Sequence, residues 1–138
     1  MSGFSFPFVE ADYTPALTFS ATTPGDMTGT FIGHYQRHGR LILFNARIIL
    51  TSKGTGGSGN VRIGIPAVAA ATFSPNCGVY TSAIDFTANY TYPFCNVVAG
   101  QAYCHLQQGG DNQVSANLTW ALIANTSIID VAGFYWAA

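Results

Sequence analysis

The sequence predicts an all-β fold, and we expect an antiparallel β-sandwich with a jelly-roll-like arrangement. Residues that favour helices are scarce, since the chain holds one Glu, one Lys and two Met. Thr, Val, Ile, Phe and Tyr, which favour strands, are abundant. Gly and Pro recur between short apolar segments and mark turns. Many short strands separated by such turns are typical of a β-sandwich or a β-barrel.

The N-terminal stretch MSGFSFPFVEADYTP, residues 1–15, is predicted to be an extended arm, and residues 16–138 the β-sandwich domain. Two prolines in this stretch block a helix. Its alternating Phe residues place an aromatic row on one side. The arm is therefore expected either to dock on a neighbouring subunit or partner, or to pack on its own domain as an edge strand. The residues expected to make the partner contact are Phe4, Phe6, Phe8 and Tyr13.

The clearest predicted strand is RLILFNARIILTSK, residues 40–53. Every second residue from Ile42 to Leu50 is apolar, so one face of this strand is wholly apolar. The other face is polar only in its middle, at Asn45 and Arg47. Because strands with two apolar faces are covered on both, we expect something to cover the ends of this second face. Those ends carry Leu41, Leu43 and Ile49.

Further strands are predicted on both sides of this one. Before it come ALTFSA and GTFIGHYQRHG, the latter with Phe31, Gly33, Tyr35 and Arg37 on one face. After it, NVRIGIP points its Val and Ile side chains inward, and AYCHLQQ separates Cys104 from His105 on opposite faces. NLTWALIA is expected to place Leu118, Trp120 and Leu122 on one strand face, and SIIDVAGFYW closes the chain.

The stretch TSKGTGGSGNVR, residues 51–62, contains the dinucleotide pattern G-x-G-x-x-G beside Lys53. A phosphate site of that kind needs a helix after the glycines, whose free N–H groups meet the phosphate. Here a strand-like segment follows and ends at Pro66. In a P-loop the lysine follows the last glycine, whereas Lys53 precedes them. We therefore predict a flexible hairpin loop rather than a nucleotide site.

No catalytic, cofactor or metal site is predicted. His34 and His38 share a strand face but lie about 13 Å apart, too far for one ion. Cys77, Cys95 and Cys104 form no C-x-x-C pair and are expected to be reduced and buried. No G-x-S-x-G motif is present, and the six carboxylates show no pairing in the sequence. The scarcity of titratable groups argues against an enzyme.

Charged residues make up only 8% of the chain, and the net charge is −1. This balance does not favour nucleic acid as a partner, and no apolar run is long enough for a membrane span. All five basic residues lie between positions 37 and 62, either as a local patch for an anion or as outward charge on adjacent strands. So few charges predict that part of the surface is buried against other subunits.

The ordered motifs resemble the small β-domain at the C-terminus of tailed-phage tail fibres and tailspikes. That family has an opening W/Y-T-P-x-L-x-F, which YTPALTF matches from Tyr13 to Phe19. It continues with a Tyr, an alternating strand and T-S-K-G, as here from Tyr35 to Gly54, and then a Gly/Ser/Thr run ending at Pro66. The segment from His105 to Trp136 is similar to the family's closing part. Together these motifs cover about positions 12 to 136.

The resemblance implies a non-enzymatic homotrimer on a virion, acting as a trimerising cap or receptor-binding module. In tail fibres such a domain follows a shaft, whereas here Met1 stands about a dozen residues before the opening motif. The first expectation is therefore a capsid decoration (cement) protein, which binds the major capsid protein on the capsid exterior after assembly in the host cytoplasm.

The alternative is a tail-fibre or tailspike tip that binds a host surface glycan. Aromatic rings stack on sugars, and the candidates for that contact are Tyr90, Tyr92, Trp120 and Trp136.

Overall fold

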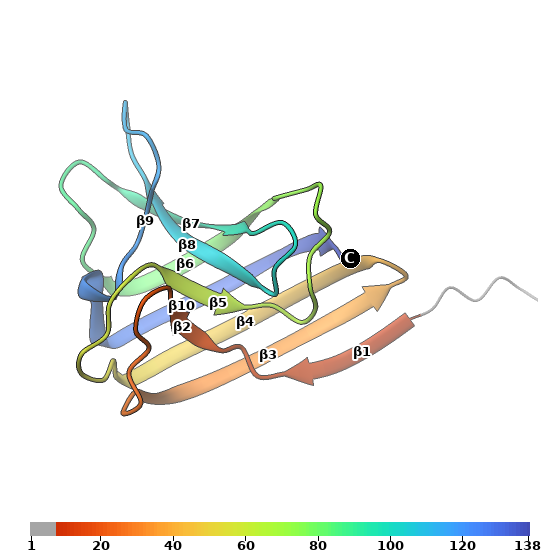
Figure 1. Cartoon of the computed structure of the whole chain (residues 1–138), viewed down its shortest axis with the longest axis horizontal. Helices are drawn as coiled ribbons and strands as arrows, with labels where there is room; N and C mark the ends of the chain where they lie inside the picture. The colour runs from red at the N-terminus through yellow and green to blue at the C-terminus, as the bar shows by residue number, and fades with distance from the viewer. Residues whose placement is uncertain (1–7) are drawn as a thin grey trace, which may run out of the picture.

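The structure of the chain is a computed structural model that describes residues 8–138. In this part of the chain, ten β-strands and one short 3-10 turn follow one another (Figure 1). The elements are β1 (Phe8–Tyr13), β2 (Leu17–Phe19), β3 (Thr28–His38), β4 (Leu41–Ser52), β5 (Val61–Gly64), β6 (Asn76–Ile84), β7 (Tyr92–Val97), β8 (Tyr103–Gly109), β9 (Ala116–Asn117), η1 (Trp120–Leu122) and β10 (Ile123–Trp136). Every strand pair is antiparallel, so the predicted all-β antiparallel class is confirmed.

The strands form one continuous sheet in the order β1-β3-β4-β10-β6-β7-β8-β5-β2, with β9 paired to β8. Because β6 pairs with β10 on one side and β7 on the other, the sheet curls over into a half-barrel (Figure 1). We call β1, β3, β4, β10 and β6 the long half, and β7, β8, β5, β2 and β9 the short half. The expected sandwich of separate sheets, with jelly-roll order, is not confirmed.

The core fills the concave side of the curled sheet, and both halves contribute to it. The inner face of β4, predicted from the alternation between Ile42 and Leu50, is buried throughout. It belongs to one apolar cluster with Val61 and Ile63 of β5 and Leu106 of β8. Burial of side chains of this size stabilises the fold by roughly 1.5–3 kcal/mol each before conformational entropy is subtracted.

The N-terminal arm is not confirmed for the residues that the structure describes. From Phe8 to Tyr13 the chain is β1, the edge strand of the long half, paired with β3 in a register that runs from His38 to Gly33. The Tyr13 hydroxyl donates a hydrogen bond of 3.3 Å to the carbonyl of Gly64, across the open side of the half-barrel. This part of the predicted arm is therefore a strand of its own domain. Phe4 and Phe6 lie outside the described residues.

One predicted strand is wrong in its middle. Trp120–Leu122 form a single 3-10 turn, so Trp120 does not share a strand face with Leu118. The chain turns here from the short half into β10, and the Trp120 N–H bonds to the carbonyl of Gly59 while the Leu122 N–H bonds to Thr119. Strands β6 and β7, which contain Gly78 and Pro93, were not among the predicted strands.

Within residues 8–138, no helix has the length and hydropathy needed to cross a membrane.

Candidate functional surfaces

The glycine-rich loop joins β4 of the long half to β5 of the short half, and it is held in place rather than flexible. The ammonium group of Lys53 lies 4.0 Å from the ring centroid of Trp120, a cation–π contact. The Trp120 indole N–H donates a hydrogen bond of 3.1 Å to the Lys53 carbonyl. Gly57 packs against the same indole, because a Cβ there would lie 2.5 Å from its ring atoms. Lys53 and Trp120 thus brace the corner between the two halves.

The same loop is not arranged as a phosphate cradle. The Thr55 N–H and the Thr55 hydroxyl both donate to the carboxylate of Asp26, each at 2.9 Å. These bonds, the one from the Thr55 N–H foremost, lower the pKa of Asp26. A carboxylate already occupies the donors that a phosphate would need, and its charge would repel one. The strand that follows the glycines and the carboxylate bound to Thr55 both argue against a phosphate cradle at this loop.

His34 lies between two carboxylates on the outer face of the long half. Its Nδ1 is 2.9 Å from Asp12 and its Nε2 is 3.0 Å from Glu10. The hydrogen bond to Asp12, followed by that to Glu10, raises the pKa of His34. The two carboxylates approach opposite nitrogens of the ring, so the three side chains do not converge on one point. No cluster of three His, Cys, Asp or Glu residues suited to a metal ion is found within residues 8–138.

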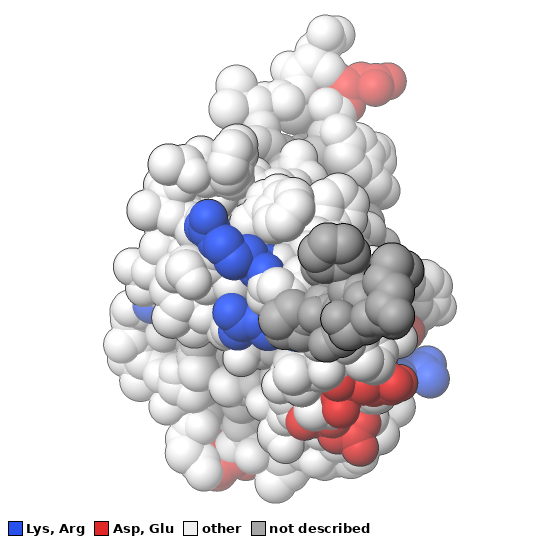
Figure 2. Space-filling view, turned by 90° about the vertical axis from the view of Figure 1, so that its right-hand side faces the viewer, with Lys and Arg blue, Asp and Glu red and all other residues white. Residues whose placement is uncertain are grey.

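This acidic site ties the edge strand to its neighbour, since Glu10 and Asp12 are on β1 and His34 is on β3. Figure 2 shows a compact red patch at the end of the molecule that carries the start of β1. Most of the surface in that view is uncharged. The imidazolium form of His34 can donate to both carboxylates at once, which strengthens the pairing of β1 with β3.

The cysteines are free and buried, as predicted. Burial raises the pKa of Cys77 to about 12 and that of Cys95 well above its ordinary value. Cys104 points into the core, whereas His105 on the next position faces outward. Raised pKa values keep the thiols of Cys77 and Cys95 protonated, and Cys104 points away from the face that carries His105, so no thiol is paired with this imidazole as nucleophile and base.

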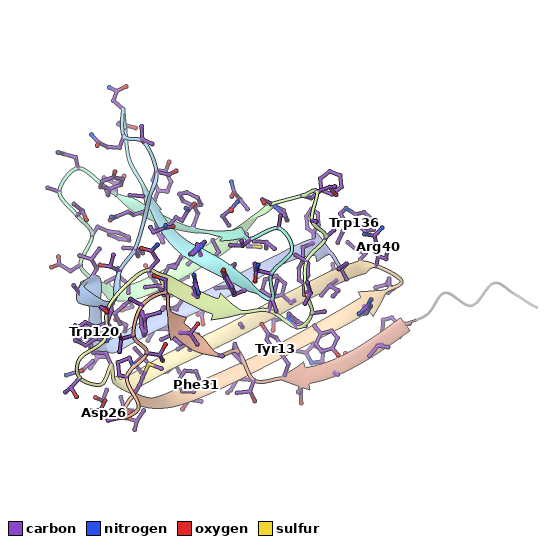
Figure 3. All side chains as sticks on the ribbon, in the orientation of Figure 1. Tyr13, Asp26, Phe31, Arg40, Trp120 and Trp136 are labelled. Atoms are coloured by element: carbon purple, nitrogen blue, oxygen red, sulfur yellow. The ribbon has the colours of Figure 1, made fainter. Side chains whose placement is uncertain are left out.

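The four aromatic residues proposed to stack on sugars lie in separate places. Trp120 braces the corner loop, and Trp136 is half-exposed at the opposite end of the molecule (Figure 3). The Tyr90 hydroxyl donates a hydrogen bond of 2.8 Å to the carbonyl of Val114. Tyr92 is half-exposed, with its ring 6.3 Å from that of Phe94. Tyr90 and Tyr92 stand beside β7, so only these two lie in one region.

The outer face of the short half is polar and organised by side-chain contacts. Arg62 lies with its guanidinium carbon 4.5 Å from the ring centroid of Tyr103, and the Tyr103 ring contacts His105 edge-on. The Gln107 amide donates to Asn117 at 2.9 Å. Burial, followed by the nearby Arg62 charge, lowers the pKa of His105. Amide groups and aromatic rings on one face are the groups that bind sugars, by hydrogen bonds and stacking.

The outer face of the long half carries exposed apolar side chains between polar ones, and three of the apolar residues were not singled out from the sequence: Ile32, Tyr80 and Phe134. Phe134 pairs with Leu43 across β10 and β4, and both are exposed. Two shallow hollows of about 460 Å³ and about 330 Å³ lie side by side on this face and share Asn45 and Ala132. The signal in the sequence was the second apolar face of strand 40–53. The exposed large apolar side chains here are Phe8, Ile32, Leu43, Tyr80, Phe134 and Trp136.

No protein-family profile matches the sequence, and no curated protein is similar to it at a significant level. One solved structure does match: the crystal structure of the Dettilon tailspike protein (gp208), with a TM-score of 0.73 and 18% sequence identity. The match covers 93% of this chain and 23% of the tailspike chain. The chain thus spans about a quarter of the length of the protein that it matches.

At this level of identity the likeness is one of fold. It extends over nearly all of the chain, so it includes both halves of the sheet. The resemblance inferred from the ordered sequence motifs is confirmed by the structure: the chain has the fold of a part of a tailspike protein.

Proposed function

We propose that this chain is a non-enzymatic domain of a phage tail, belonging to a tailspike or tail fibre and assembled as a homotrimer. The observation that carries the proposal is the match of 93% of the chain to part of a tailspike protein. The ordered sequence motifs between Tyr13 and Trp136 also support the proposal. A fold alone does not determine function, but here the fold and the ordered motifs indicate the same class of protein.

The tail is preferred to the capsid because the structural relative is a tail protein. The capsid hypothesis drew on an aromatic arm, and in the described residues that stretch is the edge strand β1. Within residues 8–138 this stretch therefore gives the capsid hypothesis no arm to draw on, whereas the tail hypothesis is supported by the structural relative.

A host-surface glycan is the proposed ligand of the assembled trimer. Support comes from the outer face of the short half, which presents polar groups and an aromatic ring. These belong to Arg62, Tyr103, Gln107 and Asn117. The half-exposed ring of Tyr92 stands on the same half. Three copies would offer three such faces to a repeating saccharide, which raises the effective affinity of a weak site.

The test is to locate the protein in purified virions with gold-labelled antibodies raised against the full chain. We expect label at the tail, and antibody saturated with the purified protein serves as the control. Label over the head would overturn the tail assignment in favour of the capsid decoration hypothesis. In a second arm, host cells incubated with purified protein should adsorb fewer virions; unchanged adsorption would contradict the receptor-binding role and leave the tail location standing.

A further inference from the structure

The long-half outer face concentrates the exposed apolar side chains of the molecule. Six of the eleven large apolar residues exposed within residues 8–138 lie on this one face. Tyr80 is 61% exposed, Ile32 59% and Phe134 58%. Single exposed apolar residues are ordinary, but a concentration of them on one face is typical of an interaction site.

The alternation of strand β4 predicts a cover for this face, and the residues that the structure describes do not supply it. The outer residue Leu43 pairs with Phe134, and Leu41 pairs with Trp136, so apolar side chains from two strands meet in a row. Leu43, Phe134 and Trp136 are nevertheless exposed. The inner face of the same strand is buried by the short half. Within residues 8–138, nothing covers this outer face.

The size of the face suits a stable protein interface. The five strands of the long half have 6, 11, 12, 14 and 9 residues. With ~3.3 Å per residue and ~4.8 Å between strands, they cover on the order of 800 Å². A specific interface buries about 800 Å² on each partner. The face is therefore about as large as one such interface, and in a closed ring of three copies two neighbours would share it.

The charges at the centre of the face favour a partner with the same composition. Arg47 and Asp130 face each other from β4 and β10, with Nε and Oδ1 3.2 Å apart. This pair is neutral as a whole, so the centres of two such faces meet without an unpaired charge. The remaining carboxylates of the face, Glu10 and Asp12, lie at its β1 edge on either side of His34. Binding to an anionic membrane or to nucleic acid needs unpaired basic side chains, and the centre of this face offers none among its described residues.

The shape of this face also suits contact with the same face of a second copy of the chain. The larger hollow is lined by Ile32, Arg47, Tyr80 and Asp130, and the aromatic rings of Phe134 and Trp136 project from the other end of the same face. Rings from one copy can enter the hollow of the next. Because the projecting part and the hollow part differ, the contact is heterologous, and a heterologous contact that closes forms a ring of subunits.

We infer that the long-half outer face is the surface through which copies of this chain pack on one another, with Phe134, Leu43 and Tyr80 at the contact. The inference rests on the homotrimer of the proposed function and identifies its interface. The short-half outer face then points away from the contact and remains open to a ligand.

The test is the mass of the full-length protein in solution, by sedimentation velocity at several concentrations. We expect the wild type at three times the chain mass of 14.6 kDa, and Phe134→Lys at one chain mass. Phe73→Lys is the matched control, because Phe73 is 59% exposed but lies in the connection between β5 and β6. It should keep the wild-type mass.

A lysine within β10 could unfold the strand instead of blocking assembly, so a second variant is needed. Leu43→Thr/Phe134→Thr replaces a cross-strand pair with β-branched residues that suit strands. It should also fall to one chain mass while keeping a cooperative thermal transition. A monomeric wild type, or folded variants that keep the wild-type mass, would overturn the inference. Neither result bears on the location of the protein in the virion, which the antibody experiment decides.

Discussion

The long half and the short half of this sheet bury similar inner faces but present different outer faces. On the long half, the outward positions of β4 and β10 carry Leu43 and Phe134. On the short half, the outward positions of β5 and β8 carry Arg62 and His105. Both halves belong to one continuous sheet and share one core, so the fold itself does not require this difference. The proposed contact between copies on one face and with a ligand on the other would account for it.

The largest expected effect comes from the core that the two halves share. Ile48→Ala in β4 and Leu106→Ala in β8 each remove a fully buried side chain, and each should lower the free energy of unfolding by about 2–5 kcal/mol. Urea unfolding at a fixed protein concentration, followed by circular dichroism and by tryptophan fluorescence, measures this. Because the core is common, both variants should unfold in one transition by both probes. A variant in which one probe changes well before the other would contradict a shared core.

The corner loop that joins the halves should give an intermediate effect. Gly57→Ala places a Cβ 2.5 Å from the Trp120 ring, and the resulting shift of the indole should cost about 1–3 kcal/mol of stability. Gly25→Ala is the matched control, since nothing lies within 4 Å of a Cβ there. It should be neutral or slightly stabilising. Equal losses of thermal stability in the two variants would show that Trp120 does not brace the corner.

The smallest effect is a pH dependence with opposite sign on the two outer faces. The pKa of His34 is raised above 6.5, so its stabilising contribution is complete below pH 6.5 and is lost as the pH rises through the raised value. The pKa of His105 is lowered below 6.5, so its contribution is present above pH 6.5 and is lost as the pH falls through the lowered value.

Urea midpoints between about pH 5 and pH 8 test this pair of contributions. His34→Gln should remove part of the loss of stability on the alkaline side, and His105→Gln part of the loss on the acidic side. The groups that face His34 are Asp12 and Glu10 of β1 and Asn45 of β4. Those near His105 are Arg62 and Asn96. If each variant shifts the urea midpoint by the same amount at every pH, the protonation of these two histidines does not contribute to the pH dependence of stability.

Local patterns were sufficient to predict most of the strands. The alternation from Ile42 to Leu50 identified β4 and its buried face, and that of Val61 and Ile63 identified β5. The apolar ends of the second face of β4 also indicated that a cover was needed. These predictions succeeded because the period of two follows from the pleat of a single strand and needs no knowledge of its neighbours.

Features that depend on distant pairings could not be predicted in the same way. The alternation that includes Phe8 suits an arm and an edge strand equally, and only the pairing with His38 distinguishes them. Trp120 has the spacing of a strand residue, but it lies in a turn because Lys53 and Gly57, more than sixty positions earlier, pack on its ring. The apolar face formed by Tyr80 and Phe134 emerges only when β6 lies beside β10.

The two ends of the curled sheet bear on how the protein resists aggregation. An unpaired edge strand is a template on which further chains can add, as in amyloid. At one end, β2 has only three residues and follows Pro15, which offers no N–H to such a chain. At the other end, β1 carries Glu10 and Asp12, whose charges would repel the same strand of an identical molecule. Crowded copies can therefore meet through a side-chain face without their backbones joining into an open-ended sheet.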